Sequence, residues 1–293
     1  MEHSNPPAIA AFLLMLAVAS VFVWVRVFQR RRLGLPLVAY EPYAVVPWSG
    51  LDLLIVGLLA IFLERAAGVF ATEFNGAPLD GLSLVAVGAV SASRMIWMAC
   101  AFVYLVTRAS ATLDDLGMDI RRFGHDLVLG GELFLATLLP VYGTFTFLTA
   151  GLGWKSEHPL TKIALDEPSV GVLAVTTLLA VVVAPLAEEF FFRVLLQGWL
   201  ERVEVKWRQR ADNDGQSDAG PPGPGYAPVV VAALPFALLH SAHGPDPIPL
   251  FILGLFLGYA YRQTHRIVAP VAIHAMFNGV TMLQLWGAFL AGE

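Results

Sequence analysis

PLAEEFFFR, the stretch of residues 185–193, determines how the rest of this chain is interpreted. It follows residues 170–183, which contain no charged side chain. Two carboxylates and a guanidinium therefore lie at the end of a segment whose natural surroundings are hydrocarbon. An ionisable group in such a place is costly, so it needs a partner, a water-filled cavity or a function.

The spacing of these charges distinguishes the two glutamates. Residues four apart on a helix lie one above the other, so Glu189 is predicted to pair with Arg193. Glu188 is turned by about 100° from Glu189, since a helix has 3.6 residues per turn. Its own neighbour four residues on is Phe192, which carries no charge. We therefore predict that Glu189 has an ion-pair partner and that Glu188 is left for chemistry.

The composition is that of an integral membrane protein. Hydrophobic residues make up 57% of the 293 residues, charged residues 14%, and the mean hydropathy is +0.68. An ordinary soluble chain is about a quarter charged. The single cysteine, Cys100, excludes a disulfide framework and a cysteine-based metal site, and we expect it to be a small buried side chain. No basic stripe indicates a nucleic-acid partner.

The hydrophobic runs predict an all-α, polytopic membrane helical bundle with about eight transmembrane helices. The predicted spans are 8–28, 51–70, 82–107, 127–150, 169–187, 227–242, 248–262 and 267–290. The first is too long for a signal-peptide core and is followed by three arginines, so we expect it to be retained. The seventh is short, so it is expected to pack inside the bundle or to begin at a re-entrant turn.

Basic residues alternate between the loops. One side of the membrane would receive Arg26, Arg30, Arg31, Arg32, Arg108, Arg121, Arg122, Arg202, Lys206, Arg208, Arg210, Arg262 and Arg266. The other side would receive only Lys155 and Lys162. The positive-inside rule then places the basic loops in the cytoplasm and both termini outside. We expect the bacterial plasma membrane, although the endoplasmic reticulum would give the same bias.

Polar side chains in two later spans complete a candidate site. His240 ends an apolar run that begins at Val229, and His274 and Asn278 lie four residues apart on one helix face. A lone histidine in a membrane more often hydrogen-bonds a neighbouring helix than performs chemistry. Together with Glu188, however, these residues supply a carboxylate, two imidazoles and an amide from three spans.

These three motifs in this order resemble the CPBP family of CAAX proteases and bacteriocin-processing enzymes, also called Abi proteins. The motifs are Glu188-Glu189-x-x-x-Arg193, Phe236-x-x-x-His240 and His274-x-x-x-Asn278. The resemblance covers roughly residues 110–290. It divides the chain into N-terminal transmembrane helices outside the family core, residues 1–107, and a catalytic membrane core, residues 108–293. Within that core, the polar composition of residues 204–226 predicts a disordered cytoplasmic loop.

The resemblance implies an intramembrane glutamic endopeptidase. Glu188 would be the general base that activates water, and His240 would help to position or polarise that water. His274 and Asn278 would bind the oxyanion of the tetrahedral intermediate, a task suited to amide and imidazole N–H groups. The resemblance leaves Glu189 and Arg193 as a structural ion pair.

A zinc-dependent intramembrane metalloprotease is the main chemical alternative. Its ligands would be Glu188, His240 and His274, and His243 could add a fourth. Against zinc, the chain contains no His-Glu-x-x-His motif, and an asparagine is a poor zinc ligand but a good oxyanion donor. We therefore expect catalysis without a cofactor.

Two alternatives of other classes remain. A non-catalytic membrane scaffold or immunity protein would keep the motifs as structural hydrogen bonds. A proton-coupled transporter is disfavoured, because no repeated halves are visible in the sequence.

The other charges in the spans, Glu64, Arg65, Arg94 and Glu132, are expected to form inter-helix ion pairs such as Glu64 with Arg94. The expected partners are the lipid bilayer and a protein or peptide substrate, whose prenylation the sequence does not specify.

Overall fold

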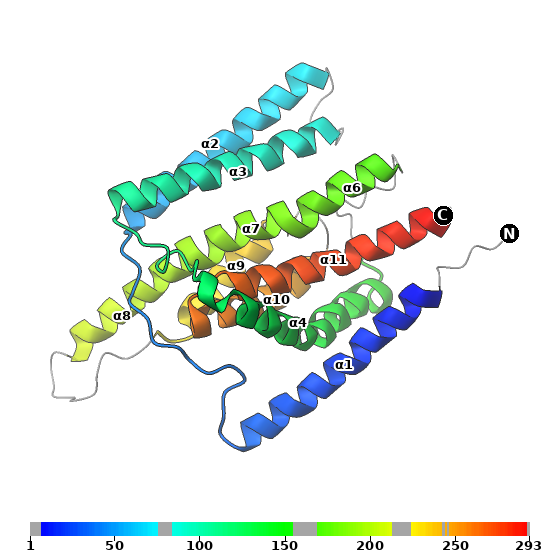
Figure 1. The fold of residues 1–293 in the computed structure, drawn as a ribbon, viewed down its shortest axis with the longest axis horizontal. Coiled ribbons are helices and arrows are strands. Elements are labelled where there is room, and N and C mark those ends of the chain that lie inside the picture. Colours follow the sequence, from blue (N-terminus) through cyan, green and yellow to red (C-terminus); the bar gives the residue numbers. More distant parts are fainter. Residues whose placement is uncertain are drawn as a thin grey trace.

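The computed structural model describes residues 7–75, 84–154, 169–212, 224–241, 244 and 246–291, and every regular element in these ranges is helical (Figure 1). His243, the additional zinc ligand considered above, lies outside the described residues. The α-helices are α1 (Pro7–Arg32), α2 (Gly50–Asn75), α3 (Leu84–Arg108), α4 (Phe123–Thr146), α6 (Val170–Leu178), α7 (Ala184–Glu189), α8 (Gly198–Asp212), α9 (Ala227–Leu238), α10 (Pro247–Thr264) and α11 (Val268–Ala291). A 3₁₀ turn, η1 (Ile120–Arg122), precedes α4, and three π-helical segments follow: η2 (Phe147–Gly151), η3 (Leu179–Val183) and η4 (Phe190–Gln197).

Six helical stretches in the described ranges are long and apolar enough to cross a membrane. These stretches are Ala8–Arg32, Gly50–Glu73, Gly88–Arg108, Ile120–Gly151, Val170–Arg210 and Val268–Ala291. Figure 1 shows the start of α1 and the end of α11 at one end of the bundle, and the basic ends of α1, α3 and α8 at the other. The chain is thus a multi-pass membrane protein, as the hydrophobic runs predict.

The fifth predicted span is too short, because its helix does not end near residue 187. Elements α6, η3, α7, η4 and α8 form one unbroken helix from Val170 to Asp212. The apolar side chains of Phe190, Val194 and Leu195 continue the buried face beyond the glutamates. The motif at residues 185–193 therefore lies in the middle of a helix, and helix α8 replaces the first part, residues 204–212, of the loop predicted over residues 204–226.

One π-helical segment, η3, precedes the motif, and a second, η4, begins inside it at Phe190, directly after the two glutamates. Pro185 lies just after η3 and has no N–H, so the carbonyl four residues earlier loses its normal helical donor. Wide turns of this kind leave backbone carbonyls that need other donors, and they are frequent at functional sites. The indole of Trp48 donates to the carbonyl of Leu195 in η4 at 3.1 Å.

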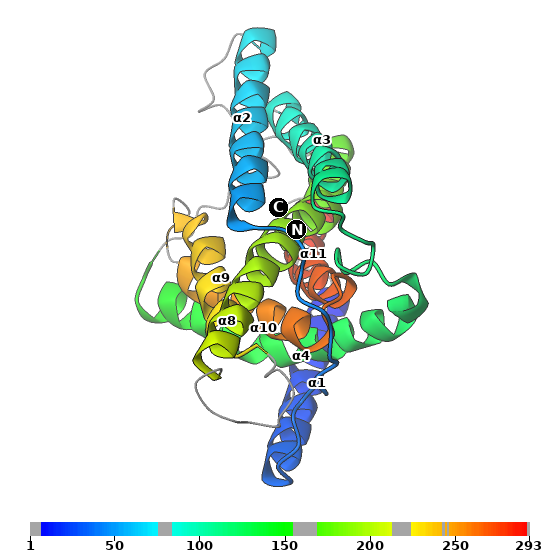
Figure 2. The same cartoon turned by 90° about the vertical axis from the view of Figure 1, so that its left-hand side faces the viewer.

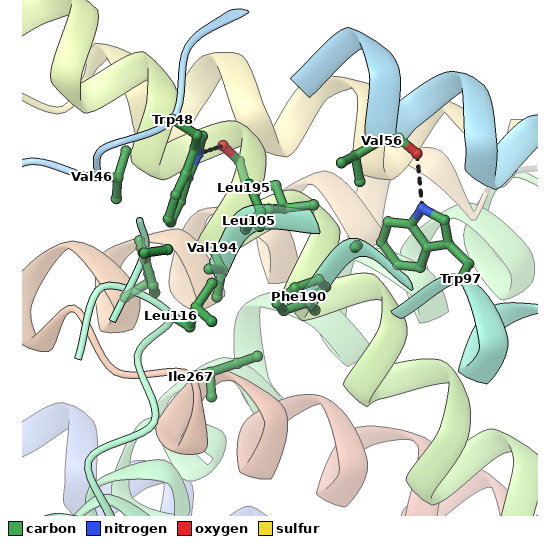
Figure 3. Packing of buried hydrophobic residues seen from close by; sticks show 13 residues of the cluster. Val46, Trp48, Val56, Trp97, Leu105, Leu116, Phe190, Val194, Leu195 and Ile267 are labelled. Carbon is green, nitrogen blue, oxygen red and sulfur yellow. Dashed lines mark hydrogen bonds between the residues drawn. The ribbon is translucent and has the colours of Figure 1, made fainter. Parts of the chain in front are cut away.

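A hydrophobic cluster joins α3 and the linker of residues 33–49 to η4 (Figure 3). Trp48 and Phe190 are fully buried, and Trp97 packs edge-on against Phe190 at 5.8 Å between ring centroids. The indole of Trp97 also donates to the carbonyl of Val56 in α2 at 2.8 Å. These contacts attach α2 and α3 to the helix that carries the glutamates.

Helix α1 attaches to α4 at a defect in α4. Pro140 lies inside α4 and cannot donate to the carbonyl of Ala136. The indole of Trp24 in α1 donates to that carbonyl instead, at 3.1 Å, and the hydroxyl of Ser20 donates to the carbonyl of Leu135 at 2.6 Å. Trp24 thus satisfies the carbonyl that the proline leaves without a helical donor, and Ser20 adds a second contact one residue earlier.

Helices α9 and α10 form a closely packed pair. A Cβ on Gly254 would lie 3.0 Å from the Cβ of Ala233, and one on Gly258 would lie 2.9 Å from a methyl carbon of Val229. Small residues that allow such close approach are typical of helix contacts in membranes. The buried positions of α10, including Leu253 and Leu257, agree with the prediction that the seventh span packs inside the bundle.

Figure 2 shows α2 and α3 on one side of the central helices and α1 on the opposite side. Helix α3 touches its neighbours with one face only, so the prediction that Cys100 is buried is wrong, and its side chain is exposed on the outer face. The central group, α4, α6 to α8 and α9 to α11, brings the three motifs together.

Candidate active site

Glu189 is the buried centre of the candidate site. Its carboxylate is fully buried, and Arg193 Nε donates to Oε2 at 2.8 Å, the contact expected from the four-residue spacing. The other oxygen, Oε1, lies 2.8 Å from Nδ1 of His274 in α11. The second contact is not apparent from the sequence, because it joins residues 85 positions apart. Glu189 therefore links two motifs as well as stabilising its own helix.

Phe236 is the apolar centre around which the motifs gather. The guanidinium of Arg193 lies 5.1 Å from the centroid of the Phe236 ring, a cation–π contact. Among the described residues, Nη1 and Nη2 of Arg193 have no hydrogen-bond partner. The aromatic face therefore supplies part of the stabilisation that this buried cation needs.

The two candidate histidines lie equally close to the same ring. The ring centroids of His240 and of His274 are each 5.7 Å from that of Phe236. Nδ1 of His240 lies 3.1 Å from the carbonyl oxygen of Phe236, one helical turn earlier. Because a carbonyl only accepts, Nδ1 of His240 carries a hydrogen in this contact.

Asn278 makes a contact that the sequence does not predict. Its amide Nδ2 donates to the carbonyl of Ala180, in π-helical segment η3, at 2.8 Å. Asn278 thereby satisfies a backbone carbonyl of the distorted turn that leads into Glu188. The amide has two N–H groups, so one remains for another acceptor.

Glu188 is not unpaired, contrary to the prediction. Arg94 of α3 places Nη1 at 3.4 Å from Glu188 Oε1 and Nη2 at 3.3 Å from Glu64 of α2. The predicted pairing of Glu64 with Arg94 is thus present, but the same guanidinium also reaches the candidate base. The sequence alone does not place Arg94 in the site, because helix periodicity relates residues within one helix and not between spans.

The charge of Glu188 is nevertheless only partly compensated. Its side chain keeps 18% of its exposed area, and neither of the Arg94 contacts is the two-pronged pair that binds a carboxylate most strongly. The site therefore contains one buried carboxylate, Glu189, and one accessible carboxylate, Glu188.

Zinc does not fit the described geometry. Within residues 7–291, leaving aside the gaps stated above, no three His, Cys, Asp or Glu side chains lie close enough together to hold a metal ion. We therefore derive no step that passes through zinc.

The comparison with protein families gives a match in the second half of the chain. Residues 170–280 match the family described as Type II CAAX prenyl endopeptidase Rce1-like. No curated protein and no solved structure matches the chain. The matched segment contains all three motifs, from Glu188 to Asn278, and confirms the resemblance to CAAX proteases. Helices α1 to α4, including Arg94, lie outside it.

Proposed function

We propose that this chain is an intramembrane endopeptidase in which Glu188 activates the attacking water. The matched family is one of membrane proteases, which supports hydrolysis of a peptide bond at the coarser level. The observation that carries the finer proposal is the gathering of three motifs around Phe236, with one glutamate buried and its neighbour accessible. The two glutamates differ in environment, as a structural residue and a base should.

The hydrolytic step needs one proton acceptor and one oxyanion site. Glu188 takes a proton from water as the water oxygen bonds to the substrate carbonyl carbon. The same proton then passes to the leaving amine nitrogen as the carbon–nitrogen bond breaks. His240, whose ring lies beside Phe236 with those of the other motifs, positions that water in this proposal.

His274 serves the oxyanion when it carries two protons. Its Nδ1 faces the Glu189 carboxylate, so Nδ1 bears a hydrogen, and an N–H at Nε2 requires the imidazolium form. A buried carboxylate beside the ring stabilises that cation. Glu189 is therefore a positioning residue that orients His274 and holds its charge.

Asn278 has two roles in this proposal. One N–H of its amide fixes the Ala180 carbonyl, and the other is available to the oxyanion. Replacement by alanine would remove both, whereas replacement by aspartate would remove the donors and add a charge.

The test compares two glutamates that share one arginine. Wild type, Glu188→Gln and Glu64→Gln are each expressed in cells lacking the native protein, and membrane proteins are searched for new chain termini. New termini are expected with wild type and Glu64→Gln and are expected to be absent with Glu188→Gln. Termini that persist in the Glu188→Gln cells would overturn the mechanism, provided that the variant reaches the membrane in equal amount.

A non-catalytic scaffold is the second candidate, favoured by the contacts of Arg94 with Glu188 and of Asn278 with Ala180. In that case the polar groups would serve only to hold helices together. Glu188→Gln would then replace wild type fully in a deletion strain, and no wild-type-dependent termini would be found.

A further inference from the structure

A small pocket lies between α1, the linker of residues 33–49 and α4, away from the candidate active site. Its polar lining consists of Arg26, Arg30 and Glu132. Its apolar lining consists of Val23, Leu37, Val38, Leu129 and Leu133. Figure 1 shows α1 at the margin of the bundle, so the pocket borders the region that lipid occupies.

The pocket lies at the depth of lipid headgroups. The run from Ala8 to Phe28 is 21 residues long, or about 31 Å at 1.5 Å per residue, close to the thickness of the hydrocarbon core. Arg26 is near the end of that run, and Arg30 lies one turn beyond it on the same face. Both side chains can therefore reach the level of the phosphates.

The charges in the pocket leave a net positive site. Arg26 meets Glu132 through a single contact of 3.2 Å, with 61% and 49% of the two side chains exposed, and such pairs are weak. Arg30 donates Nε to the carbonyl of Pro36 at 2.9 Å, which holds its guanidinium at the pocket. Two guanidinium groups and one carboxylate give a charge that complements one phosphate diester.

We propose that this pocket binds an anionic phospholipid. The phosphate would be held by Arg30 and Arg26, since planar guanidinium groups bind phosphate oxygens in pairs. One acyl chain would lie against Val23, Leu129 and Leu133, continuous with the exposed apolar face of α1. Basic pockets between helices at the cytoplasmic surface are suited to acidic lipid headgroups.

The chain supplies a matched control for this site. Arg31 and Arg32 follow directly on the same helix and carry the same charge, but they do not line the pocket. The protein is purified with Arg26→Gln and Arg30→Gln together, or with Arg31→Gln and Arg32→Gln together. Each is mixed with phosphatidylglycerol and phosphatidylethanolamine, and lipids retained on the intact protein are counted by native mass spectrometry.

The first pair of substitutions is expected to lower phosphatidylglycerol affinity about tenfold or more, because both charge-assisted contacts with the phosphate are lost. The second pair is expected to leave it within about twofold, since exposed charges contribute little. Equal losses of phosphatidylglycerol affinity in the two variants would show that the lipid is attracted to the basic helix end in general, and would contradict binding in the pocket. Unchanged affinity in the first variant would also overturn it.

Two further measurements keep the proposal testable. Val23→Phe retains every charge but narrows the pocket, and it is expected to weaken lipid retention even if the arginine variant unfolds. Inorganic phosphate is added in the absence of acidic lipid, and thermal stability is followed. If inorganic phosphate stabilises the protein as much as phosphatidylglycerol does, the pocket is a site for free anions, and the proposal that it binds a phospholipid is contradicted.

Discussion

At the scale of single residues, two adjacent glutamates have opposite surroundings. Glu189 is fully buried between Arg193 and His274, whereas Glu188 keeps part of its surface and a loose contact with Arg94. A carboxylate that neutralises a buried guanidinium is needed for folding, because removing one partner leaves an uncompensated charge. A base must instead reach water and substrate.

The two glutamates should therefore respond differently to the same substitution. Glu189→Gln is expected to lower the free energy of unfolding by about 3–5 kcal/mol, because it leaves Arg193 unpaired. Glu188→Gln is expected to lower it by less than about 1 kcal/mol, the contribution of a partly exposed pair. Thermal unfolding in detergent measures both. Equal losses would contradict the assignment of distinct roles.

Arg94 contacts Glu188, although Arg94 lies outside the segment of residues 170–280 that matches the family. We predict that Arg94→Gln lowers kcat about tenfold, the effect of about 1.4 kcal/mol in the transition state, because Glu188 loses the group that orients it. Arg94→Lys should restore part of the rate, since the positive charge remains. The rates are measured on a substrate identified by the terminus search, with protein stability as control. An Arg94→Gln enzyme with wild-type kcat would exclude this role.

At the scale of elements, one proline explains where α1 attaches to α4. Pro140 leaves the carbonyl of Ala136 without a helical donor, and Trp24 supplies one. Trp24→Phe should therefore cost about 1 kcal/mol, since a buried carbonyl loses its hydrogen bond. The cost should nearly vanish in the presence of Pro140→Ala, which restores a backbone N–H. A double-mutant cycle of thermal stabilities measures this coupling, and additive effects would refute it.

The linker of residues 33–49 is held by a buried polar cluster near the basic end of the bundle. Nε2 of His265 lies 2.6 Å from Glu201 Oε2, and the Tyr43 hydroxyl donates to the same oxygen. Arg266 binds Asp126 through two contacts, of 2.6 and 2.9 Å, and also binds Glu41. The linker is thus attached to the turn between α10 and α11 by charged groups.

This cluster predicts a pH dependence of stability. Burial lowers the pKa of His265 from 6.5, and this outweighs the opposing effect of the Glu201 carboxylate. The unfolded chain then binds more protons than the folded one just below pH 6.5, so stability should fall as the pH drops below about 6.5. His265→Asn suits the left-handed backbone at this position and should flatten the curve. Melting temperatures of the wild type and of His265→Asn from pH 7.5 to 5.5 test this. A pH curve of the same shape in the two proteins would contradict it.

At the scale of the whole molecule, the sequence predicts the type of fold and the order of its parts. Long apolar runs identify the spans, and four-residue spacing identifies the Glu189–Arg193 contact. Local patterns do not show that the helix of Glu188 continues to Asp212. The charges at residues 188–193 predict that the span ends there, whereas the chain continues as π-helical and then α-helical turns. Nor do they show that Arg94 reaches Glu188 or that Asn278 reaches Ala180, because these contacts depend on how separate spans pack.

The arrangement of the helices also makes the predicted orientation testable. If the basic loops are cytoplasmic, Gln209 in α8 and Trp154 after η2 lie on opposite sides of the membrane. Cys100 is first replaced by alanine, and cysteine is then introduced at one of these exposed positions. A membrane-impermeant thiol reagent added to intact cells should label Trp154→Cys and should label Gln209→Cys only after the cells are opened, because positive loops are retained inside. Labelling of both cysteines from outside would show that the two positions lie on the same side of the membrane, contrary to the predicted arrangement of spans. Labelling of Gln209→Cys alone would show that the orientation is the reverse of the predicted one.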